Sequence, residues 1–190
     1  ILKPSEKTPL SALYLVDLLK ECGLPQHMVQ VVTGEAPIEI VKQLVSSPLV
    51  DMVSFTGGVS VGKNIEKMMS EGGNGLKKYI PELGGCSSLI VCDDADLDKA
   101  AQLVVDGCFK NSGQRCTSVR RVVVFKSVAD ELLEKVKDLT AKISFGNPSD
   151  PEIDMGTVIS VEEAKKIEER MSMAIEAGAS LVHGGVREGA

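Results

Sequence analysis

Short apolar runs alternate with amphipathic stretches along most of this chain, and no other feature limits its fold so strongly. The runs have the length of β-strands, and the stretches between them carry apolar residues at helical spacing. Strands separated by helices of this length are connected as parallel βαβ units. The sequence therefore predicts an α/β fold with a parallel sheet, its strands lying at 29–32, 50–55, 77–83, 88–92, 120–125 and 180–183.

The expected helices fill the intervals between these strands. Thr8-Pro9 is typical of a helix start, with Thr as the cap and Pro at the first helical position, and Gly23 marks the end of that helix. We expect its apolar face to be formed by Leu10, Leu13, Val16 and Leu19. Further helices are predicted over 37–46, 60–70, 96–111, 128–143 and 161–177, and a loop over 71–75.

The pair Gly84-Gly85 separates two sets of these elements. A chain of 190 residues suits either one large domain or two small ones. We expect the boundary at this glycine turn, which gives one domain over 1–84 and a second over 85–190.

Composition and charge argue against several classes of protein. A net charge of −6 leaves no basic surface for nucleic acid, and no run approaches the roughly 18 apolar residues that span a membrane. The cysteines lack C-x-x-C spacing, and two histidines are too few and too far apart to suggest a metal site. A reducing, cytoplasmic location is favoured for the five cysteines, which are Cys22, Cys86, Cys92, Cys108 and Cys116.

One cysteine has the surroundings of a nucleophile. Cys116 follows a cation, Arg115, in a short loop that contains glycine. Only about 3% of a free cysteine is thiolate at pH 7, so a nearby base or positive charge is needed. Glu82 lies at the end of a predicted strand, just before the Gly84-Gly85 turn, which could aim its carboxylate into a cleft. The plainer alternatives are a buried small side chain at Cys116 and a solvated turn residue at Glu82. Burial is predicted for three other cysteines in apolar patterns, Cys22, Cys92 and Cys108.

A glycine-rich turn joins the strand at 50–55 to the following helix. Its glycines let the backbone approach an anion, and the helix N-terminus offers free N–H groups and a favourable dipole. Residues 57–64 also align with the phosphate-binding pattern G-x-x-x-x-G-K-[ST], but Asn64 stands where the metal-binding hydroxyl should be. Three alternatives stay open here: a pyrophosphate-binding turn, a nucleoside triphosphatase loop, and a turn that only connects strand to helix.

Several motifs, in this order and at these separations, resemble the aldehyde dehydrogenase superfamily. They cover the whole chain and comprise Lys3–Ala12, Phe55-Thr56-Gly57-Gly58, Glu82-Leu83-Gly84-Gly85, Asp94–Asp98 and Asn111–Thr117. The resemblance implies part of a Rossmann-type cofactor domain at 1–84, followed by part of an α/β catalytic domain at 85–190. It also implies oxidation of a small-molecule aldehyde with NAD or NADP, and no metal.

The resemblance assigns roles to particular residues. Cys116 would be the nucleophile and Glu82 the general base. The cofactor-binding residues would be Lys3 and Glu6 at the adenosine ribose, Ser5 near a 2′-phosphate, Phe55, Gly57 and Gly58 at the pyrophosphate turn, and Gly84 near the nicotinamide. Many family members have Ser at the position of Gly58, so a backbone N–H would take the place of that side chain here.

Other expectations concern the substrate and the extent of the chain. The loop form Gly-Gln-Arg-Cys-Thr is similar to the branch that handles glyceraldehyde 3-phosphate, lactaldehyde or phosphonoacetaldehyde. Both ends look cut, and the family's oxyanion asparagine has no counterpart in this sequence. We therefore expect an internal piece of a homo-oligomeric enzyme, inactive when isolated. The alternative is an idle fragment that keeps only a nucleotide-binding or interaction surface.

Overall fold

The computed structural model describes residues 1–72 and 76–188. Positions 73–75 of the loop expected at 71–75 lie outside this part, and Glu71 is the last residue of a helix. The chain divides into two compact units, residues 1–84 (unit 1) and 85–190 (unit 2). The described secondary structure consists of helices and parallel strand pairs, so the predicted α/β fold is confirmed.

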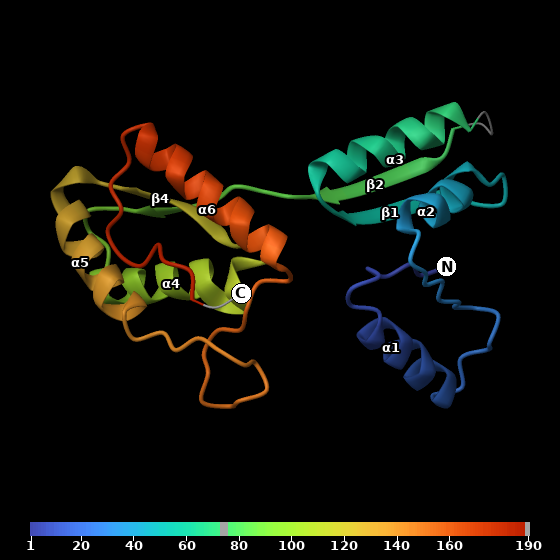
Figure 1. Ribbon diagram of the computed structural model, residues 1–190, viewed down its shortest axis with the longest axis horizontal. Coiled ribbons are helices and arrows are strands. Elements are labelled where there is room, and N and C mark those ends of the chain that lie inside the picture. The colour runs from blue at the N-terminus through green and yellow to red at the C-terminus, as the bar shows by residue number, and fades with distance from the viewer. Residues whose placement is uncertain (73–75, 189–190) are drawn as a thin grey trace. The chain divides into compact units, whose positions relative to one another are not determined.

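Unit 1 is built around a parallel strand pair and the helix that joins its two strands. Its elements are α1 (Leu10–Glu21), α2 (Pro37–Ser46), β1 (Met52–Gly57), α3 (Val59–Glu71) and β2 (Lys78–Leu83), as Figure 1 shows. β1 and β2 run parallel, from Met52 opposite Lys78 to Gly57 opposite Leu83. This part of the sequence therefore forms the βαβ unit that its apolar pattern predicts.

A glycine lets α3 lie close against this strand pair. Gly62 is buried, and a Cβ at this position would lie 2.5 Å from Leu83 Cδ2. The Tyr79 hydroxyl donates a hydrogen bond of 2.9 Å to the Gly62 carbonyl. Tyr79 and Leu83 thus face α3. Because side chains alternate along a strand, Glu82 lies on the opposite face of β2.

Three expectations for the first part of unit 1 are corrected. The strand expected at 29–32 is reduced to one parallel bridge between Leu2 and Val31. The N-cap of α1 is Pro9 rather than the preceding threonine. On α1 only Val16 is buried, and Leu10 is 77% exposed. Helical spacing predicts which residues share a face, but burying that face requires a neighbouring element. In the described part of the chain, Val16 is the one residue of α1 that is buried.

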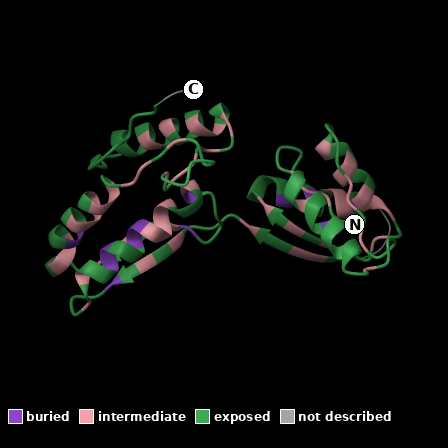
Figure 2. Ribbon diagram, turned by 90° about the horizontal axis from the view of Figure 1, so that it is seen from below, coloured by how far each residue is buried: buried purple, intermediate pink, exposed green. Residues whose placement is uncertain are grey.

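Unit 2 repeats the parallel pairing with a larger helical layer. Its elements are β3 (Ser87–Val91), α4 (Leu97–Phe109), the short 3₁₀ helices η1 (Lys110–Gly113) and η2 (Lys126–Val128), β4 (Val119–Val124), α5 (Ala129–Thr140) and α6 (Val161–Glu176). β3 and β4 are parallel, with Val91 opposite Val124. Figure 2 shows buried residues on β3, α4 and α5, where the core cluster consists of Val91, Ala100, Ala101 and Leu132.

The first turn of α4 is capped by an aspartate from the Asp94–Asp98 motif. Oδ1 of Asp96 accepts hydrogen bonds of 3.1 Å from the backbone N–H groups of Asp98 and Lys99. These are two of the N–H groups that a helix start leaves without a carbonyl partner. The motif therefore fixes the point at which the chain leaves β3 and enters α4.

The strand expected at 180–183 is wrong. Residues 179–188 form neither helix nor strand. A β-strand needs a neighbour for its backbone N–H and C=O groups, and 180–183 pair with no other segment in the described part of the chain. The apolar character of Leu181 and Val182 is therefore not enough to make a strand here.

Candidate active site

Cys116 lies at the tip of a tight turn between η1 and β4. The Ser118 N–H donates a hydrogen bond of 3.2 Å to the Arg115 carbonyl, so Cys116 and Thr117 are the central residues of the turn. The thiol is exposed, and the Cys116 N–H has no hydrogen-bond partner among the described residues. A small molecule can reach the thiol, and a free N–H beside it is the kind of group that stabilises an oxyanion.

The segment before this turn has an unusual backbone. Asn111, Ser112 and Gly113 have φ values of 56°, 54° and 66°. Residues other than glycine rarely adopt this left-handed conformation, although Asn tolerates it better than most. The run redirects the chain from the end of α4 at Phe109 toward β4.

Hydrogen bonds and a close contact hold this left-handed run in place. The Gln114 N–H donates to the Asn111 carbonyl at 3.0 Å, and the Asn111 side-chain amide donates to the Gln114 carbonyl at 3.4 Å. From β4, Nη2 of Arg120 donates a hydrogen bond of 2.7 Å to the Gly113 carbonyl. A Cβ at Gly113 would lie 2.9 Å from the Cys108 carbonyl oxygen. The backbone conformation of residues 111–113 is therefore tightly restrained.

Two small residues pack beside the cysteine turn. At Gly85 a Cβ would lie 3.1 Å from the Cys116 carbonyl oxygen, so a larger residue would press on the turn. Ser118 is fully buried, and its Oγ has no hydrogen-bond partner among the described residues. Buried hydroxyls usually have a hydrogen-bond partner, so Ser118 is an exception: its side chain is enclosed, but its hydroxyl makes no hydrogen bond to the described residues.

The Arg115 side chain is exposed next to Cys116. Within residues 1–72 and 76–188, its guanidinium takes part in no hydrogen bond or ion pair. Guanidinium groups bind carboxylate and phosphate oxygens through paired N–H donors. Arg115 is therefore free to bind a negatively charged group beside the cysteine turn.

The other cysteines differ from Cys116 in position or in acidity. Cys108 on α4 is half-buried, and burial raises the pKa of its thiol, an effect that the positive charge of Arg120 partly offsets. A raised pKa leaves less thiolate at neutral pH, so this thiol should react slowly. The expected burial of Cys22 and Cys92 is wrong. Both are exposed, because Cys22 is the C-cap of α1 and Cys92 follows the last residue of β3.

Glu82 lies in unit 1, one residue before the end of β2, and is exposed. Its partner across the strand pair is Thr56 on β1. Since Glu82 is on the face of β2 opposite α3, no part of α3 covers its carboxylate. Solvent can reach the carboxylate, as a base that takes a proton from water requires.

The turn from β1 into α3 is built from two glycines. A Cβ at Gly57 would lie 2.5 Å from the far end of the Phe55 ring, so a side chain there would displace the ring. Gly58 is the N-cap of α3, and nothing lies within 4 Å of its Cβ position. The first N–H groups of α3 are therefore open to an approaching anion, which the helix dipole also favours.

The remaining predicted cofactor residues lie at two other points of unit 1. Before α1, Nζ of Lys3 donates a hydrogen bond of 2.6 Å to the Pro4 carbonyl, and Oγ of Ser5 accepts one of 3.2 Å from the Lys7 N–H. Glu6 follows them and is exposed. Gly84 comes directly after β2 and is also exposed. The structure thus places the predicted cofactor residues before α1, at the β1–α3 turn and at the end of β2.

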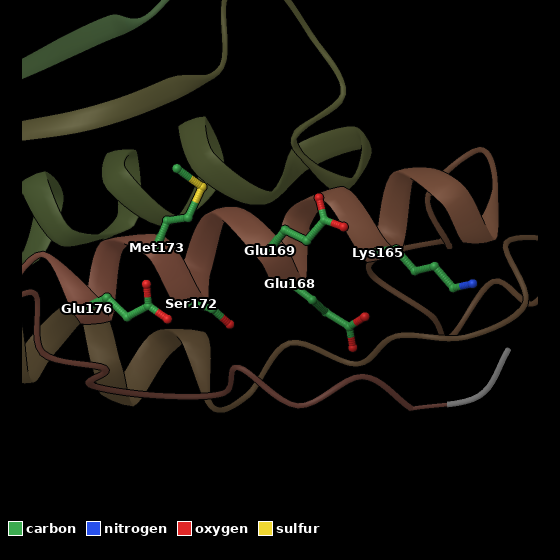
Figure 3. Close-up of a pocket in the computed structure, with 6 residues that line it drawn as sticks. All are labelled: Lys165, Glu168, Glu169, Ser172, Met173 and Glu176. Carbon is green, nitrogen blue, oxygen red and sulfur yellow. The ribbon is translucent and has the colours of Figure 1, made fainter.

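Two hollows on unit 2 are lined by none of the predicted site residues. One, of about 310 Å³, lies between α4, α5 and residues 142–155. The other, of about 530 Å³, runs along α6, from which all its lining residues project in Figure 3: Lys165, Glu168, Glu169, Ser172, Met173 and Glu176.

Across the described residues, no three His, Cys, Asp or Glu side chains converge as metal ligands would. No helix in this part has both the length and the apolar character that a membrane crossing needs.

Sequence reasoning missed three residues that shape the cysteine turn: Ser112, Gln114 and Arg120. A signal was present in Asn111-Ser112-Gly113, since Asn, Ser and Gly are the residue types that turns select. The hydrogen-bond partners of these side chains include backbone groups as far away in sequence as residues 156–159. Only the tertiary structure reveals those partners.

Known proteins match this chain along nearly its whole length. The aldehyde dehydrogenase family model matches residues 1–190. The chain is 42% identical over 190 residues to the 3-sulfolactaldehyde dehydrogenase of Priestia aryabhattai, covering 100% of this chain and 39% of that protein. The crystal structure of an NAD-dependent aldehyde dehydrogenase from Sinorhizobium meliloti is 38% identical, with a TM-score of 0.93 over 99% of this chain and 37% of its own. An E. coli NADP-dependent enzyme is 38% identical, with a TM-score of 0.90 over 97% of this chain and 37% of its own.

These matches exclude one of the three alternatives for the glycine turn. The stretch 57–64 lies inside the matched family, so the nucleoside triphosphatase alternative is wrong. The chain spans 39% of the length of the curated relatives that it matches. Its parallel βαβ units have the architecture of the solved relatives. The chain belongs to the aldehyde dehydrogenase family.

Proposed function

We propose that these residues are part of an enzyme that oxidises an aldehyde to a carboxylic acid with NAD or NADP. Because the chain spans 39% of the length of its curated relatives, the proposal concerns the protein at its natural length, as a homo-oligomer. Residues 1–84 would be the C-terminal part of the NAD(P)-binding domain, and 85–190 the N-terminal part of the catalytic domain. Family membership and the exposed thiol at the turn tip support this proposal.

The β1–α3 turn fits the pyrophosphate of a nicotinamide dinucleotide. Its open Gly58 gives access to the N–H groups that start α3, and Phe55 and Gly57 shape the approach. Lys3 and Glu6 would bind the adenosine ribose. Ser5 would contact the 2′-phosphate of NADP, and Gly84 would lie near the nicotinamide. When bound, the dinucleotide supplies a hydride acceptor.

In the proposed reaction, the Cys116 thiolate attacks the aldehyde carbon. A carbon–sulfur bond forms, and the carbonyl oxygen becomes the oxyanion of a thiohemiacetal. The Cys116 N–H, which has no partner among the described residues, would donate a hydrogen bond to that oxygen. When the C–H bond then breaks with loss of hydride, a thioester of Cys116 is left.

Glu82 would act in the second half of the reaction. Its carboxylate takes a proton from a water molecule, and the water oxygen attacks the thioester carbon. The carbon–sulfur bond breaks, the carboxylic acid leaves, and the Cys116 thiolate is regenerated. The exposure of Glu82 on the open face of β2 suits this role, because water must reach it.

We also propose that the aldehyde carries an acidic group. Arg115 stands next to Cys116 with an unpaired guanidinium in the described structure, so a carboxylate, phosphate or sulfonate on the substrate would meet a matching charge. A relative at 42% identity is named for 3-sulfolactaldehyde, an aldehyde of this type.

The observation that carries the proposal is the exposed Cys116 at the turn tip. The experiment follows absorbance of the reduced cofactor with 3-sulfolactaldehyde and lactaldehyde, each with NAD and with NADP. Cys116→Ser should abolish turnover, since a serine hydroxyl is a much weaker nucleophile than a thiolate. Cys92→Ser, at another exposed cysteine, serves as the matched control and should keep it. Turnover by Cys116→Ser at the parent rate would contradict the proposal.

A further inference from the structure

The loop that carries Cys116 is fastened to a distant segment of unit 2, residues 156–159. Oγ of Ser112 donates a hydrogen bond of 2.6 Å to the Gly156 carbonyl. Oε1 of Gln114 accepts one of 3.0 Å from the Ile159 N–H, and its Nε2 donates one of 3.4 Å to the Thr157 carbonyl. We refer to these three hydrogen bonds together as the loop clamp.

Gln114 is the central member of the loop clamp because it binds in two directions. Toward residues 157–159, its amide accepts from one backbone group and donates to another, as a neighbouring peptide group would. Toward its own loop, the same Nε2 donates a hydrogen bond of 3.4 Å to the Asn111 carbonyl. A single side chain thus joins the start of the left-handed run to a separate segment.

The segment that receives the loop clamp is itself fixed at both ends. Before it, Phe145 and Met155 form a parallel bridge, and the Gly146 N–H donates a hydrogen bond of 3.0 Å to the Met155 carbonyl. After it, Oγ of Ser160 caps α6 by accepting a hydrogen bond of 3.3 Å from the Glu163 N–H. An anchor held in this way can restrain the loop that binds to it.

The restraint matters because the loop has an unfavourable backbone conformation. Asn111 and Ser112 both have positive φ, and a left-handed conformation costs roughly 1–2 kcal/mol for each residue other than glycine. Without outside contacts, such a run tends to relax to more common backbone angles. Gln114 follows it directly and precedes the turn from Arg115 to Ser118 that presents the thiol.

From these contacts we infer that Gln114 is a positioning residue: through the loop clamp it holds Cys116 in the orientation needed for attack on the aldehyde. The inference rests on the proposed function, in which Cys116 is the nucleophile. Gln114 itself touches neither substrate nor reacting atoms in this account, and acts only through the loop. Its contribution should therefore appear in the rate of thioester formation rather than in the number of working sites.

The test is a pre-steady-state burst of reduced cofactor in the protein at its natural length. Gln114→Met keeps the length of the side chain but makes no hydrogen bonds. Its burst rate constant should fall between about tenfold and a hundredfold, because small misplacements of a nucleophile are costly. Gln114→Glu keeps the acceptor for the Ile159 N–H but loses both N–H donors, so an intermediate rate constant is expected.

Gln102→Met is the matched control, since the Gln102 amide on α4 also makes a surface hydrogen bond, to Asp106 at 3.2 Å. It should keep the parent burst rate constant. Burst amplitude and thermal unfolding are measured for every variant, because a merely structural role would lower the amplitude and leave the rate constant unchanged. Rate constants within twofold of the parent in both Gln114 variants would overturn the inference, whatever the amplitude. Activity retained by Cys116→Ser would instead overturn the proposed function.

Discussion

A methyl group added at Gly113 should both destabilise the protein and disturb Cys116. Gly113 has a φ of 66°, and an added Cβ would lie 2.9 Å from the Cys108 carbonyl oxygen. The backbone conformation alone costs an alanine roughly 1–2 kcal/mol. The contact adds about 1–3 kcal/mol of crowding, because a backbone oxygen cannot turn aside as a side chain can. We expect Gly113→Ala to lower the free energy of unfolding by the sum of these effects.

Gly178 supplies the control that separates the two contributions. It also has a positive φ, 98°, but nothing lies within 4 Å of its Cβ position. In urea unfolding, Gly178→Ala should show only the conformational cost, and it should keep the parent burst rate constant. Gly113→Ala should be less stable than Gly178→Ala and should form the thioester more slowly. Equal losses of stability in the two variants would contradict this prediction, because they would show that the Cys108 carbonyl does not confine the loop.

Three further predictions concern side chains near the cysteine turn. Ser118→Ala should raise the free energy of unfolding by about 1 kcal/mol, because it removes a buried hydroxyl that has no partner among the described residues; a clear loss in urea unfolding would contradict this. Burial raises the pKa of the Cys108 thiol, so at every pH its thiolate fraction is lower than that of an unburied cysteine. Peptide mapping after iodoacetamide at pH 8 should therefore show slower labelling of Cys108 than of the exposed cysteines. Equal labelling rates would contradict this prediction. Arg115→Met should raise KM for an acidic aldehyde about tenfold or more and leave KM for a neutral one nearly unchanged, with Arg170→Met on α6 as control; equal effects on both aldehydes would remove Arg115 from substrate binding.

The local pattern of the chain predicted its elements well where strand and helix are adjacent in sequence. The βαβ unit of β1, α3 and β2 depends on apolar alternation and a glycine turn, which are local features. The end of α1 is also local, since Gly23 takes a φ of 92° that few other residues accept. The expected strand at 180–183 failed because a strand depends on a partner, and the apolar content of a segment does not supply one.

The candidate site divides in the same way. Cys116 and Glu82 could be singled out from the sequence because their motifs are short and resemble those of a known family. The loop clamp could not, because Gln114 and Ser112 bind backbone groups more than forty residues away. The exposure of Cys92 was also missed, since an apolar run predicts a strand but not that the next residue lies at its surface end.

In the proposed reaction Cys116 forms a thioester, which Glu82 hydrolyses with water. The most direct test is mass spectrometry of Glu82→Gln, at natural length, after mixing with aldehyde and oxidised cofactor. Gln keeps the shape of the side chain but cannot take a proton from water, so the thioester should accumulate. We predict a mass increase equal to the acyl group less the thiol hydrogen that it replaces, on the peptide that contains Cys116, only when both aldehyde and cofactor are present. An adduct on another cysteine, or turnover at the parent rate without any adduct, would contradict these roles of Cys116 and Glu82.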